Sequence, residues 1–212
     1  MRASKHVGNR SEEWAMHVKG LEMPGYEPRG LKTMALALAV STRGACHNRS
    51  SAYESDFSEK VDRYKISEDR GQITAQSEDF SAILDSMIWC KFIRKAFNNF
   101  YEESVEVLNC ITGWNVTTDE LIKTGERINN SKKLFNIREG WQRSDDILPK
   151  RIFQDKLHTN SNEEMNLSEH DLNKMIESYY SAREWNQDGT IPYSKILELN
   201  LDNLTNKVHQ KI

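Results

Sequence analysis

The sequence predicts an all-α, multihelical protein. Apolar residues recur at intervals of three and four in the middle and last thirds of the chain, the spacing of one buried helix face. Two of these stretches open with Thr or Ser followed three positions later by Glu or Asp, a typical helix start. An alanine- and leucine-rich run nearer the start consists of strong helix formers. The 212 residues suffice for one sizeable core, or for one domain and a fragment of another.

Composition indicates a globular chain that lacks some core material. Hydrophobic residues make up 37% of the sequence and charged residues 29%, so we expect a buried face that needs a partner. The formal charge is −3, and both signs are interspersed rather than grouped. Neither nucleic acid nor an anionic membrane is therefore favoured as a partner.

Location and redox state follow from three further observations. The longest apolar run, Met34 to Val40, is far too short to span a bilayer. The first twenty residues are polar and contain no secretory signal, so we expect a cytoplasmic chain with no membrane segment. The three cysteines, at positions 46, 90 and 110, are odd in number and widely spaced, which does not suit a disulfide framework.

The first helix is expected from Leu31 to Thr42. Before it, Gly20 to Gly30 is rich in glycine and proline and predicts a loop, or a linker between domains. After it, Gly44 can take a positive φ and turn the chain. His47 follows this turn. Its imidazole, with an ordinary pKa of about 6.5, could move a proton, or it could be a hydrogen-bonded structural histidine.

Residues 48 to 78 are polar with few apolar anchors, which predicts a surface excursion in which little function should be sought. Helical spacing returns at Phe80 and continues to Thr112-Gly113, with a break or turn expected near Cys90. The next helix begins at Thr117, whose partner in a capping box is Glu120.

Three features of the last ninety residues predict local structure. Gly125, in the stripe of the helix after Thr117, marks a close contact with a neighbour. Residues 135–151 combine basic, acidic and aromatic side chains, which is consistent with an ordered ion-pair cluster or with a plain charged loop. A third helix opens at Ser168 and buries five apolar or aromatic positions on one face: Leu172, Met175, Ile176, Tyr179 and Tyr180.

Residues 184–189 resemble the start of a calcium loop. Position 9 is Pro192, and position 12, which needs a bidentate Glu, is Lys195. The same residues are explained by a turn that leads into a short helix from Pro192 to Leu199.

The stretch most suggestive of chemistry is Asp85-Ser86-Met87-Ile88-Trp89-Cys90. It places a carboxylate and a thiol at the two ends of a bulky apolar patch. A thiolate among apolar neighbours suits an iron-sulfur cluster, and a carboxylate can accept paired N–H bonds from a flat heterocycle. A buried structural cysteine would explain the same residues.

Several segments together carry a family resemblance. His17 to Pro24 with Tyr26 to Gly30, Arg43-Gly44-Ala45-Cys46-His47, and the blocks Thr112-Gly113, Gly125 to Ile128 and Phe135 to Arg151 occur in the order found in one family. This sequence resembles the C-terminal helical region of the aldehyde ferredoxin oxidoreductases, which are tungsten or molybdenum bis-pterin enzymes. The resemblance divides the chain into residues 1–30, the end of a preceding helical domain and linker, and residues 31–212, a C-terminal helical domain.

The resemblance also implies site residues. The family's Asp-x-x-Gly-Leu-Cys motif falls on Asp85 to Cys90. It assigns Asp85, with the neighbouring Trp89, to pterin binding, Cys90 to iron of a [4Fe-4S] cluster, and His47 to proton movement near the metal. Ile88 and Trp89 replace the family's Gly-Leu, and a branched residue restricts the approach of backbone to pterin.

The family's other three cluster cysteines, and its N-terminal pterin-binding domain, have no counterpart in this sequence. The resemblance therefore implies an N-terminal portion of the same enzyme as partner, with ferredoxin and an aldehyde substrate. The implied reaction oxidises the aldehyde to a carboxylic acid and passes electrons through the cluster to ferredoxin. The alternative is a catalytically inactive remnant or a helical interaction module.

Overall fold

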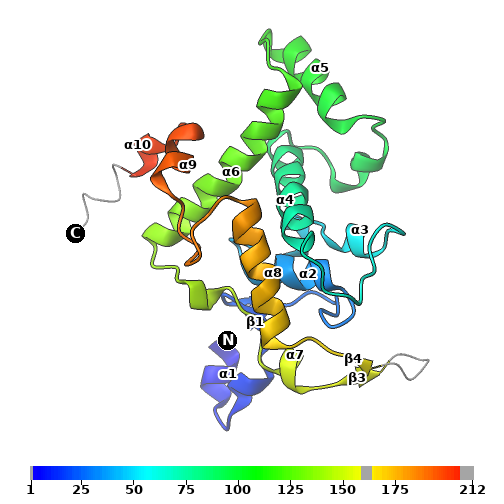
Figure 1. Cartoon of the computed structure of the whole chain (residues 1–212), viewed down its shortest axis with the longest axis vertical. Coiled ribbons are helices and arrows are strands. Elements are labelled where there is room, and N and C mark those ends of the chain that lie inside the picture. Colours follow the sequence, from blue (N-terminus) through cyan, green and yellow to red (C-terminus); the bar gives the residue numbers. More distant parts are fainter. Residues whose placement is uncertain (1, 159–163, 206–212) are drawn as a thin grey trace.

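The computed structural model describes residues 2–158 and 164–205 and confirms the predicted all-α class (Figure 1). Residues 206–212, the end of the predicted domain, lie outside the described part. The longer helices are α2 (Lys32–Val40), α4 (Arg70–Ser86), α5 (Phe100–Thr112), α6 (Thr118–Arg138) and α8 (Glu169–Ala182). Shorter helices are α1 (Arg2–Val7), α3 (Tyr53–Asp56), α7 (Arg151–Gln154), α9 (Tyr193–Glu198) and α10 (Asp202–Thr205). Single 3-10 turns are η1 (Ser11–Trp14), η2 (His47–Arg49), η3 (Lys91–Lys95) and η4 (Arg143–Asp145).

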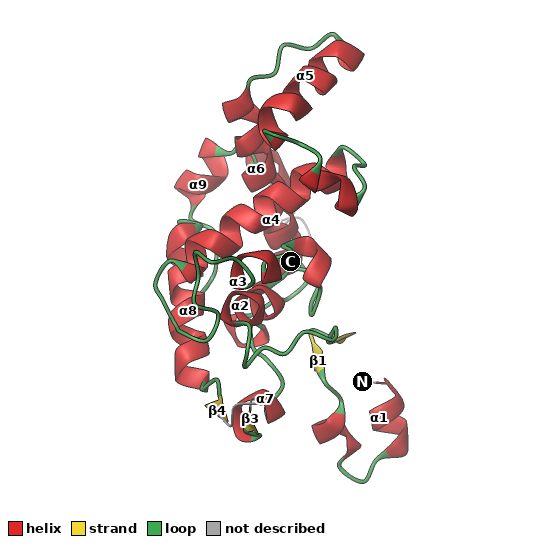
Figure 2. Cartoon of the chain, turned by 90° about the vertical axis from the view of Figure 1, so that its right-hand side faces the viewer, coloured by secondary structure: helices red, strands yellow, loops and turns green. Residues whose placement is uncertain are grey.

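Helix α2 lies at the centre of the molecule. Every residue from Lys32 to Val40 is buried, with α3, α4 and α8 packed against it (Figure 2). Its alanines allow these neighbours to approach closely. The carboxylate of Asp56 accepts hydrogen bonds from the amides of Thr33 (3.1 Å) and Met34 (2.9 Å), which satisfies two donors at the buried helix start.

The interpretation of residues 48–78 as a surface excursion is wrong in part. Helix α4 begins at Arg70, ten positions before the apolar spacing returns, and its first turns are buried. Nη1 of Arg70 lies 3.0 Å from Oδ1 of Asp56, and both side chains are almost fully buried. The sequence predicts exposure because most buried residues of this stretch are polar or charged, and the pairing of Asp56 with Arg70 is a tertiary effect.

Glycines set the distance between α4 and its two main neighbours. A Cβ on Gly71 would lie 2.3 Å from the backbone carbonyl carbon of Ser178 on α8. A Cβ on Gly125 of α6 would lie 2.7 Å from the carbonyl oxygen of Asp79 on α4, which confirms the close contact predicted for Gly125. Both helices therefore cross α4 at backbone distance.

A second, smaller core joins the end of α4 to α5 and α6. Its buried members are Ile83, Leu84, Phe100 and Leu121. Aromatic rings surround them, with Phe80 and Phe100 at a centroid distance of 4.3 Å. This lobe forms the upper part of the molecule in Figure 1. Helix α4 thus takes part in both cores, with Ala75 in the larger one and Ile83 and Leu84 in the smaller one.

Short hairpins and caps complete the fold. Strand β1 (His17–Val18) pairs antiparallel with β2 (Leu21–Glu22). Of the two, β2 lies inside the segment from Gly20 to Gly30 that was predicted as a loop. Strand β3 (Leu157–His158) pairs antiparallel with β4 (Glu164–Met165). Gly44 has φ 104°, and a Cβ there would lie 2.5 Å from the carbonyl oxygen of Val18. Thr117 and Ser168 cap α6 and α8 as predicted.

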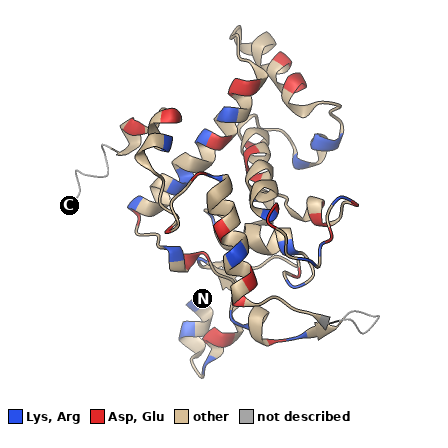
Figure 3. Ribbon diagram, viewed as in Figure 1, with Lys and Arg blue, Asp and Glu red and all other residues tan. Residues whose placement is uncertain are grey.

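Two general properties concern the lengths of the apolar helices and the distribution of charge. Among the described residues, no helix combines the length and apolar character needed to cross a membrane. Figure 3 shows lysines and arginines interspersed with acidic residues along the described chain.

Candidate functional site

The predicted site lies where α4 ends. The amide of Trp89 donates to the carbonyl of Leu84 at 3.0 Å, and the amide of Ile88 donates to the carbonyl of Asp85 at 3.2 Å. These two bonds form a Schellman motif, which commonly has glycine at its residue with positive φ. Here that residue is Ile88, with φ 59° and a relative exposure of 90%. The motif turns the chain so that Cys90 lies exposed at the surface just beyond the helix.

The Asp85 carboxylate is engaged through one oxygen. Oδ2 accepts a hydrogen bond from Nη1 of Arg49 on η2 at 2.7 Å. Nζ of Lys91 lies 3.9 Å from Oδ1, too far for a hydrogen bond. The Arg49–Asp85 pair is partly exposed and contributes little stability. Oδ1 therefore remains available as an acceptor.

Lys91 connects the predicted residues electrostatically. Its Nζ is buried and has no hydrogen-bond partner. Burial lowers the pKa of Lys91, Asp85 opposes this shift, and Arg49 adds to it. Burial and the charge of Lys91 both lower the pKa of His47, which favours its neutral imidazole form. The His47 ring lies 5.3 Å from that of Tyr26.

Trp89 belongs partly to the smaller core. Its ring packs edge to face with Phe97 at a centroid distance of 5.5 Å. Its indole Nε1 is buried and has no hydrogen-bond partner, which is uncommon for a buried indole. Trp89 thus anchors the turn and leaves an unused donor next to Cys90.

The residues present fit one corner of an iron-sulfur site. Cys90 is exposed, and the residues on either side of it, Trp89 and Lys91, carry buried donors without partners. However, the described part of the chain contains no group of three or more His, Cys, Asp or Glu side chains able to hold a metal ion. A four-iron cluster needs four ligands, so Cys90 can bind one only together with cysteines from elsewhere.

The sequence did not predict two residues that lie next to Asp85 in this site, Arg49 and Lys91. Arg49 lies in the stretch interpreted as a surface excursion, and Lys91, which directly follows Cys90, was given no role. Arg49 is two positions after His47, and this closeness in sequence was the available signal. The structure brings Arg49, Asp85 and Lys91 together, and it brings His47 within electrostatic range of Lys91.

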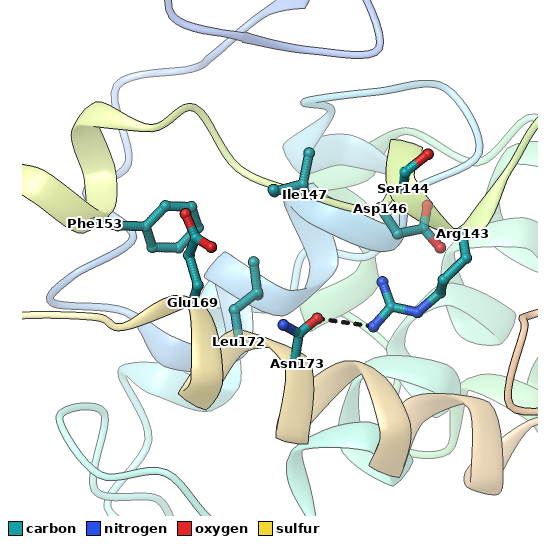
Figure 4. A pocket seen from close by; sticks show the side chains of 8 residues that line it. All are labelled: Arg143, Ser144, Asp146, Ile147, Phe153, Glu169, Leu172 and Asn173. Carbon is teal, nitrogen blue, oxygen red and sulfur yellow. Dashed lines mark hydrogen bonds between the residues drawn. The ribbon is translucent and has the colours of Figure 1, made fainter.

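A separate cavity of about 160 Å³ lies at the start of α8, away from these residues (Figure 4). Arg143 on its rim donates to Oδ1 of Asn173 at 2.9 Å, the dashed line in the figure. Its floor includes Leu172. None of the predicted site residues lines it.

Asp146, which lines this cavity, is buried and lies in an ordered ion-pair cluster, in the segment for which a charged loop was the alternative. Its carboxylate lies 2.7 Å from Nζ of Lys19 and 3.6 Å from Nζ of Lys133. It also accepts bonds from Trp141 Nε1 (3.1 Å) and the Tyr180 hydroxyl (2.6 Å). Asp146 therefore links the β1–β2 turn, α6, the loop after α6 and α8, and both of its oxygens are engaged.

Comparison with known sequences decides the family. Residues 1–201 match the model of the family described as aldehyde ferredoxin oxidoreductase, domains 2 & 3. The chain belongs to this family. It is 33% identical over 193 residues to the tungsten-containing aldehyde ferredoxin oxidoreductase of Pyrococcus furiosus, and 32% identical over 193 residues to that of Thermococcus kodakarensis. Both matches cover 89% of this chain, which spans only 31% of the length of either relative.

A solved structure supports the fold assignment for this member of the aldehyde ferredoxin oxidoreductase family. The active-site complex BamBC of benzoyl coenzyme A reductase, in complex with 1,5-dienoyl-CoA, superposes with a TM-score of 0.74. The superposition covers 99% of this chain and 36% of that chain, at 16% sequence identity. This likeness confirms the multihelical fold alone.

Proposed function

We propose that this chain forms the C-terminal part of an aldehyde:ferredoxin oxidoreductase, and that an N-terminal portion of the same enzyme completes its cofactor sites. The observation that carries the proposal is the turn after α4, which presents the Cys90 thiol at the surface between two residues whose buried donors have no hydrogen-bond partner. The comparison with the relatives supports this proposal. The chain spans only 31% of their length, so about two thirds of such an enzyme is available to supply the missing ligands.

Each candidate site residue then has a role. Cys90 would ligate one iron of a [4Fe-4S] cluster. Oδ1 of Asp85 would accept N–H bonds from the pterin, with Trp89 as a further pterin-binding residue, while Arg49 holds Oδ2. His47, whose lowered pKa favours the neutral imidazole, would accept a proton.

The chemistry itself belongs to the bound groups. When bound, a tungsten or molybdenum bis-pterin would supply the two-electron oxidation of an aldehyde and water to a carboxylic acid and two protons, and a cluster would supply the route for the electrons to ferredoxin. The protein positions these groups and moves protons. Under this proposal residues 1–30 are the end of a preceding domain, and the turn after α4 faces the N-terminal portion.

Co-expression with an N-terminal portion from this family tests the proposal. The purified pair should contain iron and tungsten or molybdenum, and should show the broad visible absorption of an iron-sulfur protein. Cys90→Ser should abolish the iron and the absorption. Cys110→Ser is the matched control, because Cys110 is also exposed, and it should leave both unchanged. A pair without metal, or equal effects of the two substitutions, would contradict the proposal.

The second candidate is a catalytically inactive remnant or helical interaction module. It is favoured by Ile88, which occupies the positive-φ position where the family motif has glycine. Large exposed apolar residues near the same turn, Ile88 and Phe92, suit a protein contact equally well. A stable pair with the N-terminal portion that contains no metal would support this candidate over the first.

A further inference from the structure

A basic pocket of about 490 Å³ lies between α6 and the segment that links α2 to η2. This volume is sufficient for a small organic molecule. The side-chain amide of Asn136 on α6 donates to the carbonyl of Thr42 at 2.7 Å, which ties the two walls together. The pocket is therefore part of the fixed structure rather than a gap between unconnected elements.

Three cations line the pocket and no carboxylate does. They are Arg43 from the linking segment, Arg49 from η2 and Lys132 from α6. Asp85, outside the lining, engages one nitrogen of Arg49. Arg43 bonds only weakly, with Nη1 3.7 Å from Sγ of Cys46. Within the described part of the chain, Lys132 forms no ion pair or hydrogen bond through its side chain.

This arrangement leaves the positive charge of the pocket only partly compensated, because Asp85 pairs, among the lining cations, with Arg49 alone. Burial lowers the pKa of Lys132, and the charge of Arg49 lowers it further, while Glu78, Asp85 and Asp79 oppose the shift. Arg49 and Lys132 thus repel each other. An anion in the pocket would relieve this repulsion and satisfy the free donors.

We propose that this pocket binds a small molecule carrying an oxyanion group, either a carboxylate or a phosphate. Guanidinium groups such as those of Arg43 and Arg49 present paired donors that match the geometry of such groups. The side chain of Phe135, half exposed on the α6 wall, offers an apolar surface to the rest of the molecule. The site uses only residues of this chain, so it holds whether or not the chain takes part in aldehyde oxidation.

Calorimetric titration of the full chain tests the proposal with three probes at equal ionic strength: inorganic pyrophosphate, glutarate and chloride. We expect saturable binding of pyrophosphate, glutarate or both, and none of chloride. Lys132→Ala should weaken binding roughly 10- to 100-fold, the usual effect of removing one charged hydrogen bond. Lys174→Ala, which removes an exposed lysine on α8, is the matched control and should change nothing.

The outcomes separate the two sources of the oxyanion. Binding of pyrophosphate alone identifies a phosphate site, and binding of glutarate alone identifies a carboxylate site. Binding of chloride with equal heat, no binding of any probe, or equal affinities of the two lysine variants would overturn the proposal. An NMR titration of the unaltered chain gives an independent readout, because a bound anion should raise the pKa of Lys132, and an unmoved pKa would count against it.

Discussion

Replacing Ile88 by glycine is expected to raise the free energy of unfolding by about 1 kcal/mol. A residue with a Cβ in the left-handed region costs about 1–2 kcal/mol, and a β-branched side chain is especially unfavourable there. Glycine removes this cost, although its greater freedom in the unfolded chain takes back about 0.4–1 kcal/mol. Since Ile88 is 90% exposed, little packing is lost with its side chain.

Urea unfolding of the chain, followed by circular dichroism, measures the effect. The matched control is Ile111→Gly. Ile111 is also largely exposed, at 79%, but it lies within α5, where glycine should lower the free energy of unfolding by about 0.5 kcal/mol. The two substitutions should therefore act with opposite signs. If Ile88→Gly destabilises the chain as much as Ile111→Gly does, the reasoning from backbone strain is refuted.

Three further predictions concern the core. Burial lowers the pKa of Lys133 to about 7. Between pH 7 and 8 the unfolded chain therefore binds a proton that the folded chain lacks. The free energy of unfolding should then rise with pH by up to about 1.4 kcal/mol per pH unit. Lys133→Met should flatten this slope in urea titrations at several pH values; above pH 8, Lys32, whose pKa is about 8, adds a similar slope. Gly71→Ala should destabilise the chain by about 3 kcal/mol, because its Cβ would meet the backbone of α8, whereas thermal unfolding with an unchanged midpoint would disprove the contact. Asp56→Ala should cost about 3–5 kcal/mol in the same assay because it leaves a buried arginine unpaired, and a cost under 1 kcal/mol would contradict the buried pair.

The elements predicted best are those whose signals are local. Thr117 and Ser168 each accept a hydrogen bond from an amide three positions later, and this geometry depends only on neighbouring residues. The buried face of α8 likewise follows from its spacing alone. The start of α4 was missed because Arg70 is buried only through its pairing with Asp56, fourteen positions earlier. Charged residues predict exposure unless their partner is known.

The candidate site divides in the same way. Asp85 and Cys90 lie together because one helix end and one turn hold both, so their order in the sequence was enough to suggest them. The approach of Arg49 to Asp85 depends on how η2 packs against α4, which periodicity does not reveal. The influence of Lys91 on His47 requires burial of the ammonium between these elements. Family resemblance gave roles to some residues but no signal for these contacts.

The hydrogen bonds of the turn also indicate how it could recognise a cofactor. The amides of Ile88 and Trp89 are both used to close the end of α4, so neither is free to donate to a ligand. The side-chain groups without a hydrogen-bond partner are Oδ1 of Asp85, Nε1 of Trp89 and Nζ of Lys91, and the thiol of Cys90 is exposed beside them in the sequence. Exchanging the family's Gly-Leu for Ile-Trp therefore removes no backbone donor and acts only through the space that Ile88 occupies. Because that side chain is exposed, cofactor loading of the co-expressed pair depends on room at one position, and Ile88→Gly should increase the loading if the chain is an active part of the enzyme.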